Sequence, residues 1–458
     1  MYEEFRLVAT DFKIVKSEGK KTVKFRVQVP VSPAGELIPG ETSSYDAREM
    51  RDHLAGWELQ TLQWPEVIKL GSLLGNVMFP GKVQGLLINS LSITKERGKR
   101  LRIRLILESD LHNIPWEYAL LNRAGGEPTK TDFLGLTPDV SLVRHQAAEL
   151  PNWTITATLP VNIIVALSNA LDSRPLNLAQ ERKAIEDAVA SNANLLATYI
   201  PDATPENFLG DLTSAHLFHF AGHGDFQTQL GPEPGSVEGE GAIILDDGYG
   251  DPKWLRAGDL ALRLRKLGIR VAFLGACRSG RRDNVNVWSS VATALLKADV
   301  GAVVSMQYNV LDDSAAAFAR EFYDAVVSGL TIDEAVTNGR LAVAALEDVR
   351  GWGVPVVYLR ANDGVLFPEF ADNKQLEASR NRIRMKVTQH IDTLKGKAVG
   401  LINEGEVDDA EVVQRANVVE ENAELIGIHN KKGGGDTTTK QEAKEVRGKI
   451  YGNIIDKL

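Results

Sequence analysis

From residue 161 onward, short runs of apolar residues alternate with segments of helical pattern, and this alternation limits the possible folds more than any other feature. Three such runs cover 161–167, 271–276 and 301–306. A strand is apolar throughout when helices cover both faces of its sheet. Between and after the runs lie predicted helices at 179–190, 285–298, 312–327 and 332–345. Repeated strand–helix–strand units predict an α/β fold with a mostly parallel sheet flanked by helices.

The first 150 residues have a mixed pattern. Polar and apolar residues alternate over 21–29 and again over 102–107, which predicts strands with one face in water. The segment 44–74 is mostly helical in pattern. We therefore expect an N-terminal mixed α/β region over 1–80, followed by a first half-domain over 81–150 and a larger α/β domain over 151–368.

Composition excludes several classes of protein. The chain has 458 residues and a net charge of −9, which disfavours nucleic acid as a direct partner because backbone binding needs a cationic surface. Its one cysteine, Cys277, cannot form an internal disulfide, and the chain has no cysteine cluster for structural zinc. The acidic N-terminal residues and the short apolar runs predict neither a signal peptide nor a membrane span. We expect a cytoplasmic protein without cofactor or metal.

Residues 371–458 differ in composition from the rest, with no Trp or Phe and many charged residues. Two stretches, from Thr388 and from Val413, resemble each other loosely. Apolar residues recur every fourth position near the end, which is the spacing of an amphipathic helix; they are Val446, Ile450, Ile454 and Leu458. We expect an interaction or regulatory tail, built from short β-forming assembly motifs or from helices.

Two predicted strands end in residues that can carry out chemistry. One ends at Gly222-His223-Gly224 and a later one ends at Gly275-Ala276-Cys277. Functional groups of open α/β sheets gather at the carboxyl edge of the strands. A thiol beside an imidazole is the minimal pair for acyl transfer, although a single cysteine on a buried strand is often only a small apolar residue. The sequence therefore leaves a catalytic and a structural role for Cys277 open.

These residues resemble a known family. The segments 219–226 and 274–280 are similar to the CHAT domain, a group of caspase-like proteins that is also similar to separase. The resemblance extends over about residues 80–365 and includes the Pro115-Trp116-Glu117 segment. It implies a caspase-like fold and a cysteine endopeptidase with a His–Cys dyad, in which His223 is the general base and acid and Cys277 is the nucleophile.

The physical chemistry of a thiol protease fits this resemblance. A neighbouring imidazolium lowers the pKa of a thiol and so populates the attacking thiolate. The oxyanion needs fixed donors, and the backbone N–H groups of Gly224 and Cys277 are the candidates. We expect a supporting role for His219, which lies inside its strand and is otherwise a core histidine with satisfied hydrogen bonds.

The substrate pocket is less well defined by the sequence. We expect it near the loop that begins at residue 168 and near 305–309. Asp172 or Asp225 would favour a basic substrate side chain, whereas Ser305, Gln307 and Tyr308 would suit a neutral one. The residues alone leave this choice open.

Three other functions are weighed against the peptidase. A catalytically silent CHAT-like scaffold that binds partner proteins is the main alternative, and activity data alone would distinguish the two. A nucleotide-binding effector is disfavoured because the G-x-x-x-x-G-K-[ST] loop is missing, and a metal hydrolase because no two histidines have i, i+4 spacing on a helix. For a peptidase we expect a protein substrate and a regulatory or recruiting protein that binds through 1–80 and 371–458.

Overall fold

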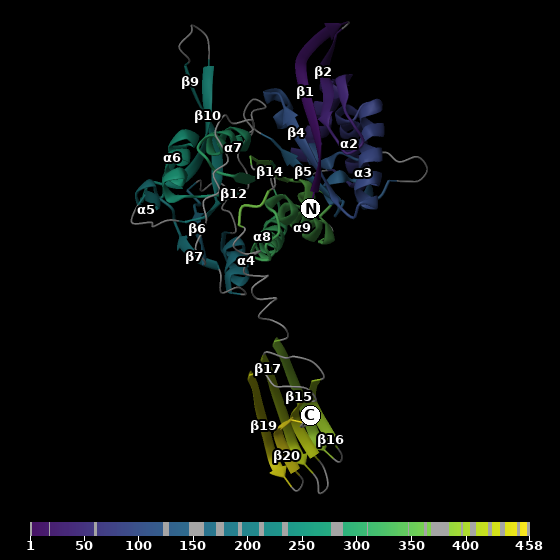
Figure 1. Cartoon of the computed structure of the whole chain (residues 1–458). Helices are drawn as coiled ribbons and strands as arrows, with labels where there is room; N and C mark the ends of the chain where they lie inside the picture. Colours follow the sequence, from purple (N-terminus) through teal and green to yellow (C-terminus); the bar gives the residue numbers. More distant parts are fainter. Residues whose placement is uncertain are drawn as a thin grey trace. The chain divides into compact units, whose positions relative to one another are not determined.

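The chain divides into two compact units, Met1–Phe370 and Ala371–Leu458, in the computed structural model (Figure 1). In the first unit, the structure describes 2–17, 19–58, 62–121, 128–145, 160–170, 178–190, 195–209, 215–230, 237–275, 287–308, 310–346, 348–360 and 364–367. In the second unit, it describes six strands between 384 and 455.

The first unit contains an 11-stranded sheet with the order β3-β2-β1-β4-β5-β14-β13-β12-β8-β6-β7. Most neighbouring strands are parallel, and the antiparallel pairs are β1–β2, β2–β3 and β13–β14. In chain order the strands are β1 (Tyr2–Ser17), β2 (Lys20–Val31), β3 (Leu37–Asp46), β4 (Arg100–Leu107), β5 (Val140–Arg144), β6 (Val161–Leu167), β7 (Leu195–Ile200), β8 (Leu217–Ala221), β12 (Val271–Gly275), β13 (Ala302–Met306) and β14 (Pro355–Leu359).

Helices cover both faces of this sheet. Side chains alternate along each strand, so one set from β6, β8, β12 and β13 packs with α4, α8 and α9. The other set packs with α5, α6 and α7. The predicted α/β fold with a mostly parallel, helix-flanked sheet is therefore confirmed. The helices are α1 (Ala47–Glu58), α2 (Trp64–Met78), α3 (Lys82–Glu96), α4 (Leu178–Ala190), α5 (Pro205–Leu209), α6 (Ala257–Leu267), α7 (Val287–Lys297), α8 (Asp312–Val327) and α9 (Ile332–Ala345).

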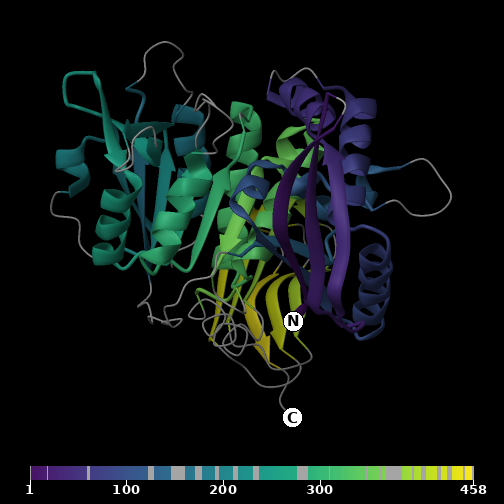
Figure 2. The same ribbon diagram turned by 90° about the horizontal axis from the view of Figure 1, so that it is seen from above.

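The N-terminal strands extend the main sheet. Figure 2 shows β1, β2 and β3 (purple) side by side, and β1 pairs in parallel with β4 from Tyr2↔Arg100 to Ala9↔Leu107. A second, three-stranded sheet has the order β11-β10-β9. Its strands are β9 (His223–Leu230), β10 (Val237–Asp246) and β11 (Pro252–Arg256).

The prediction that strand 102–107 has one face in water is wrong. Arg102 and Arg104 of β4 are 4% and 1% exposed. Arg102 forms a two-point ion pair with Asp333 of α9, and Arg104 Nε lies 2.8 Å from Glu4 Oε1. Arginine can be buried when its charge is paired and its N–H groups are bonded. The polar half of the alternation therefore marks buried ion pairs.

In the second unit, the expectation of an amphipathic helix near the C-terminus is wrong. Its described strands are β15 (Arg384–Leu394), β16 (Lys397–Asn403), β17 (Asp409–Val419), β18 (Glu424–Asn430), β19 (Asp436–Val446) and β20 (Lys449–Ile455). The four-residue spacing that suggested a helix is also a multiple of the two-residue period of a strand. Over the described part of the chain, no helix is both long and apolar enough to cross a membrane.

Candidate active site

Three parallel strands end side by side at one edge of the main sheet. Leu167 of β6 is the register partner of Ala221 of β8, and Ala221 is the partner of Gly275 of β12. Backbone bonds continue past the strand ends: Ser168 N donates to Ala221 O at 2.9 Å, and Gly222 N donates to Gly275 O at 3.3 Å. The carboxyl ends of β6, β8 and β12 therefore lie next to one another.

His223 lies where the chain passes from the main sheet into the second sheet. It is the first residue of β9 and pairs in register with Ile244 of β10. Gly222 precedes it, and a Cβ added to Gly222 would lie 2.5 Å from the Phe220 ring. His223 is 4% exposed. Only glycine fits at this bend, and the bend sets the position of the His223 backbone.

Gly224 lies against the indole of Trp288, in the first turn of α7. A Cβ added to Gly224 would approach Trp288 Cζ2 to 2.6 Å. Trp288 is 1% exposed, so its ring has little room to move. Packing against Trp288 therefore requires a glycine at position 224, which the sequence did not reveal. This requirement is separate from the expected role of the Gly224 N–H as an oxyanion donor.

Cys277 lies in 276–286, outside the described residues. Both flanks of this segment are described, and both lie near His223. On one side, Gly275 is the register partner of Ala221, two residues before His223. On the other side, α7 begins at Val287 and packs against the second sheet, where Gly241 N donates to Ser290 Oγ at 3.0 Å.

His219 lies inside β8 with both ring nitrogens in hydrogen bonds. Its Nε2 is 3.0 Å from Glu181 Oε1 of α4, and its Nδ1 is 2.8 Å from the Tyr323 hydroxyl of α8. Burial, together with the Glu181 charge, raises the pKa of Tyr323 well above its usual value, so the hydroxyl stays protonated. With Nε2–H donating to the Glu181 carboxyl, Nδ1 accepts from the Tyr323 hydroxyl.

This arrangement places a carboxylate beside the strand that leads to Cys277. The His219 ring stacks on Phe273 of β12, with centroids 4.5 Å apart. A Cβ added to Gly275 would lie 2.5 Å from Glu181 Oε1. His219 therefore holds Glu181 against the last residue of β12. Both ring nitrogens of His219 are engaged, so its role is to position Glu181.

The residues expected around the substrate pocket are placed as follows. Asp172 lies outside the described residues. Asp225 accepts hydrogen bonds from Trp254 Nε1 at 3.3 Å and from the N–H of Phe226 at 2.8 Å. Ser305 lies within β13, 1% exposed, as the register partner of Leu274.

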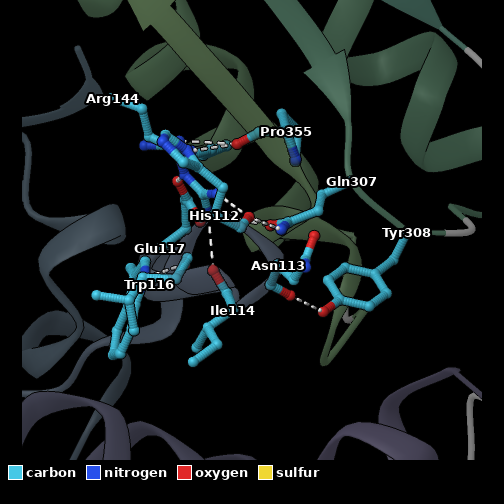
Figure 3. A network of polar contacts seen from close by, with 11 residues as sticks. His112, Asn113, Ile114, Trp116, Glu117, Arg144, Gln307, Tyr308 and Pro355 are labelled. Carbon is cyan, nitrogen blue, oxygen red and sulfur yellow. Dashed lines mark hydrogen bonds and ion pairs between the residues drawn. The ribbon is translucent and has the colours of Figure 1, made fainter. Parts of the chain in front are cut away.

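Gln307 and Tyr308 belong to a polar network that joins the two halves of the first unit (Figure 3). The side chains of Arg144 and Glu117 are fully buried and form a two-point ion pair, with N–O distances of 2.7 and 3.1 Å. Gln307 accepts from Arg144 and donates to the carbonyl of His112, and Tyr308 donates to the carbonyl of Asn113 at 3.1 Å. Both side chains therefore hold the segment that precedes Trp116.

His112, in the same network, makes stability depend on pH. Burial and the nearby Arg144 charge lower the pKa of His112 to about 4. In the unfolded chain the ring titrates near 6.5, so between these values only the unfolded state takes up the proton. The free energy of unfolding is therefore unaffected by His112 above pH 6.5, and it decreases as the pH falls from 6.5 toward 4.

We expect protonation of His112 in the unfolded chain to lower the free energy of unfolding by about 2 kcal/mol between pH 7 and pH 4.5. The His112→Phe variant keeps a ring against Tyr358 and cannot titrate, so its loss of stability over the same interval should be smaller by that amount. Urea unfolding of both proteins at the two pH values measures the difference. Equal losses would show that His112 is not buried as a neutral ring.

Sequence reasoning did not identify Glu181, Tyr323 or Trp288 as site residues. Each lies on a helix and reaches this edge of the sheet through helix packing, so no local spacing marks it. Among the residues that the structure describes, no group of three His, Cys, Asp or Glu residues is placed to hold a metal ion.

The sequence and the structure were compared with known proteins. No curated protein matches the sequence. A structure of the Saccharomyces cerevisiae separase–securin complex at 2.6 Å resolution matches with a TM-score of 0.43 and 13% identity, over 78% of this chain and 30% of that chain. A second structure of that complex, at 3.0 Å resolution, matches with a TM-score of 0.35 and 18% identity, over 60% of this chain and 17% of that chain. This protein thus spans less than a third of the separase chains it matches.

The family itself is shown by the sequence of the chain. The sequence pattern of the CHAT domain matches residues 69–380. That range includes β4 to β14, the edge where β6, β8 and β12 end, and the segment with Cys277. The match covers more than half of the sequence, and the chain therefore belongs to the CHAT domain family.

Proposed function

We propose that this protein is a cysteine endopeptidase that cleaves a peptide bond in a protein substrate through His223 and Cys277. Membership in the CHAT family supports the class of reaction. The observation that carries the proposal is the register of β8 with β12, because Ala221 pairs with Gly275 and the dyad residues each follow two positions later. Two residues of chain span at most about 7 Å, so this register limits how far apart the two residues can lie.

The reaction would proceed through an acyl-enzyme. The Cys277 thiolate attacks the carbonyl carbon of the substrate, and His223 holds the proton taken from the thiol. The tetrahedral intermediate collapses as His223 gives this proton to the leaving amine, and a thioester remains. His223 then takes a proton from water, the hydroxide attacks the thioester, and release of the acid returns the proton to the thiol.

Other residues would support the dyad. The backbone N–H groups of Gly224 and Cys277 would stabilise the oxyanion, because donors fixed in advance cost no reorganisation during the reaction. Glu181, held by His219, lies against Gly275 and would help to orient the segment that follows β12. Asp172, Asp225 and Ser305 remain candidates for the substrate pocket, whereas the polar groups of Gln307 and Tyr308 already bind the 112–113 carbonyls.

A peptidase of this kind would be regulated by a partner protein. Within residues 1–80, β1, β2 and β3 are part of the main sheet, and a partner would bind on the outer surface of this region. Residues 371–458 form a separate compact unit and are suited to recruitment. Removing this second unit should change partner binding or activation and leave the first unit folded.

Alkylation of the single cysteine tests the dyad. An ordinary thiol is only about 3% ionised at pH 7, so a thiolate stabilised by His223 should react with iodoacetamide about 10- to 30-fold faster. We expect His223→Ala to lose this excess, and the rate is measured by intact mass with Cys277→Ala as the blank. The matched control is His53→Ala on α1, which should label like the wild type.

Equal, slow labelling of wild type and His223→Ala would contradict an activated dyad. Residual reactivity would then be that of an isolated thiol, and the catalytically silent scaffold would be the better description. A peptide-library assay on the wild type completes the test, since cleavage that disappears in both Cys277→Ala and His223→Ala requires the two residues together.

A further inference from the structure

The second unit is a stack of three similar layers. Each layer contains one strand of 11 residues and one of 7 residues, in the pairs β15–β16, β17–β18 and β19–β20. The long strands form one parallel sheet in the order β15-β17-β19, and the short strands form another in the order β16-β18-β20. Each layer therefore lies on the previous one with both of its strands paired in parallel.

The register places residues of the same kind above one another. Gln389 pairs with Gln414, and Gln414 pairs with Gln441. In the short strands, the pairs Val399↔Ile426 and Leu401↔Ile428 place Gly400 level with Gly427. Parallel, in-register stacking of similar segments is the arrangement by which separate chains form continuous cross-β sheets.

Both ends of this stack are open among the strands that the structure describes. β15 and β16 have a strand partner on one side only, and so do β19 and β20. The edge of a sheet presents backbone N–H and C=O groups that can pair with another chain. The first and the last layer are therefore two complementary edges.

We propose that the second unit is a self-assembly module, in which the last layer (β19 and β20) binds the first layer (β15 and β16) of another copy of this chain. The new layer would continue the register already present within one chain. Because the two joined edges are different, the interface is heterologous, and repetition of it builds an open filament. Such assembly would occur whether or not Cys277 is catalytic.

Charges at two register positions of the long strands support this head-to-tail pairing, whereas the short strands would place Lys449 opposite Lys397 of the next copy. Arg384, Asp409 and Asp436 occupy one position in successive layers, so the next copy would place its Arg384 opposite Asp436. Asp392 and Lys444 share another position, because both lie level with Asn417 of the middle layer, between its paired residues Ala416 and Val418. They also have opposite charge.

The uncharged positions agree with the same direction of growth. Gln441 would meet Gln389 of the next copy, which extends the row of glutamines by one layer. By contrast, two copies of β19 paired in the same direction and register would place Asp436 and Lys444 opposite themselves, and like charges directly opposite each other are unfavourable. The pattern therefore favours joining the last layer of one chain to the first layer of the next.

The Asp436→Arg/Lys444→Asp double variant separates assembly from folding. Within one chain, Asp436 is opposite Asp409, and Lys444 lies at the position of Asn417, so the changes are neutral or favourable there. Between chains, the introduced arginine would lie opposite Arg384 of the next copy, and the introduced aspartate would lie opposite its Asp392. We expect the concentration needed for assembly of the full chain to rise about 10-fold, from two cross-strand pairs that change from opposite to like charge.

Sedimentation velocity over a concentration series and negative-stain electron microscopy measure the assembly. Wild type should form filaments of concentration-dependent size, and so should the control Lys183→Asp/Asp187→Lys, which reverses an exposed ion pair on α4. Circular dichroism verifies that the double variant is folded. A wild type that stays monomeric throughout, or a double variant that assembles like wild type, would overturn the proposal.

A mixing experiment gives a second, independent readout. The double variant keeps an intact first layer, so it can bind the end of a wild-type filament, but it binds the next copy about 10-fold more weakly. Small amounts of it should shorten wild-type filaments, whereas the α4 control should not. Unchanged filament length would show that growth does not use the last layer, and would contradict the proposal even if wild type assembles.

Discussion

The Glu117→Gln variant should lower the free energy of unfolding of the first unit by about 3–5 kcal/mol, because it leaves a buried arginine without its counter-charge. Glu117 and Arg144 have no exposed side-chain surface. Arg144 also donates to the carbonyls of His112 and Ile114 and to Gln307. Its guanidinium thus joins β5 to the 112–117 segment and to the end of β13, and cannot move into water without breaking these bonds. Urea unfolding measures the effect.

Two controls distinguish loss of this network from a general effect of substitution. Glu186→Gln makes the same change in an Arg–Glu pair on α4 whose side chains are 42% and 43% exposed, and should cost less than about 0.5 kcal/mol. The double variant Glu117→Leu/Arg144→Met removes both charges and should be closer to wild type than Glu117→Gln alone. If Glu117→Gln costs no more than Glu186→Gln, the buried pair does not hold the two halves together.

Much of the fold could be predicted because its strands are apolar on both faces. The runs at 161–167, 271–276 and 301–306 became β6, β12 and β13 with shifts of one residue at most. The pattern was misleading where a buried strand contains paired arginines, as in β4, since alternation then resembles a half-exposed strand. It was also ambiguous near the C-terminus, where a four-residue spacing fits both a helix and a strand.

Only the site residues at the ends of strands could be predicted from the sequence. His223 and Gly275 follow from local sequence, because a turn glycine marks the end of each buried run. Glu181, Tyr323 and Trp288 reach the site from helices, and their roles depend on packing distances that no spacing encodes. The network around Arg144 shows the same limit, since it joins residues up to 195 positions apart.

The Gly224→Ala variant should reduce the reactivity of Cys277 to nearly that of His223→Ala. A Cβ at this position would lie 2.6 Å from Cζ2 and 2.7 Å from Cη2 of Trp288. Either the indole moves with the start of α7, which displaces one flank of the Cys277 segment, or β9 moves and displaces His223 itself. Overpacking of this kind costs about 1–3 kcal/mol, which a folded protein of this size can tolerate.

The pH dependence of labelling identifies the cause of the loss. If His223 no longer stabilises the thiolate, alkylation should follow a thiol with a midpoint near pH 8.5, whereas the wild-type midpoint should be lower. The matched control is Gly85→Ala in α3, where an added Cβ meets nothing within 4 Å. That change should raise stability by up to about 1 kcal/mol and leave labelling unchanged. A Gly224→Ala protein that labels like wild type would mean that the contact with Trp288 does not set the position of His223, and the dyad geometry would then depend on the Ala221–Gly275 register alone.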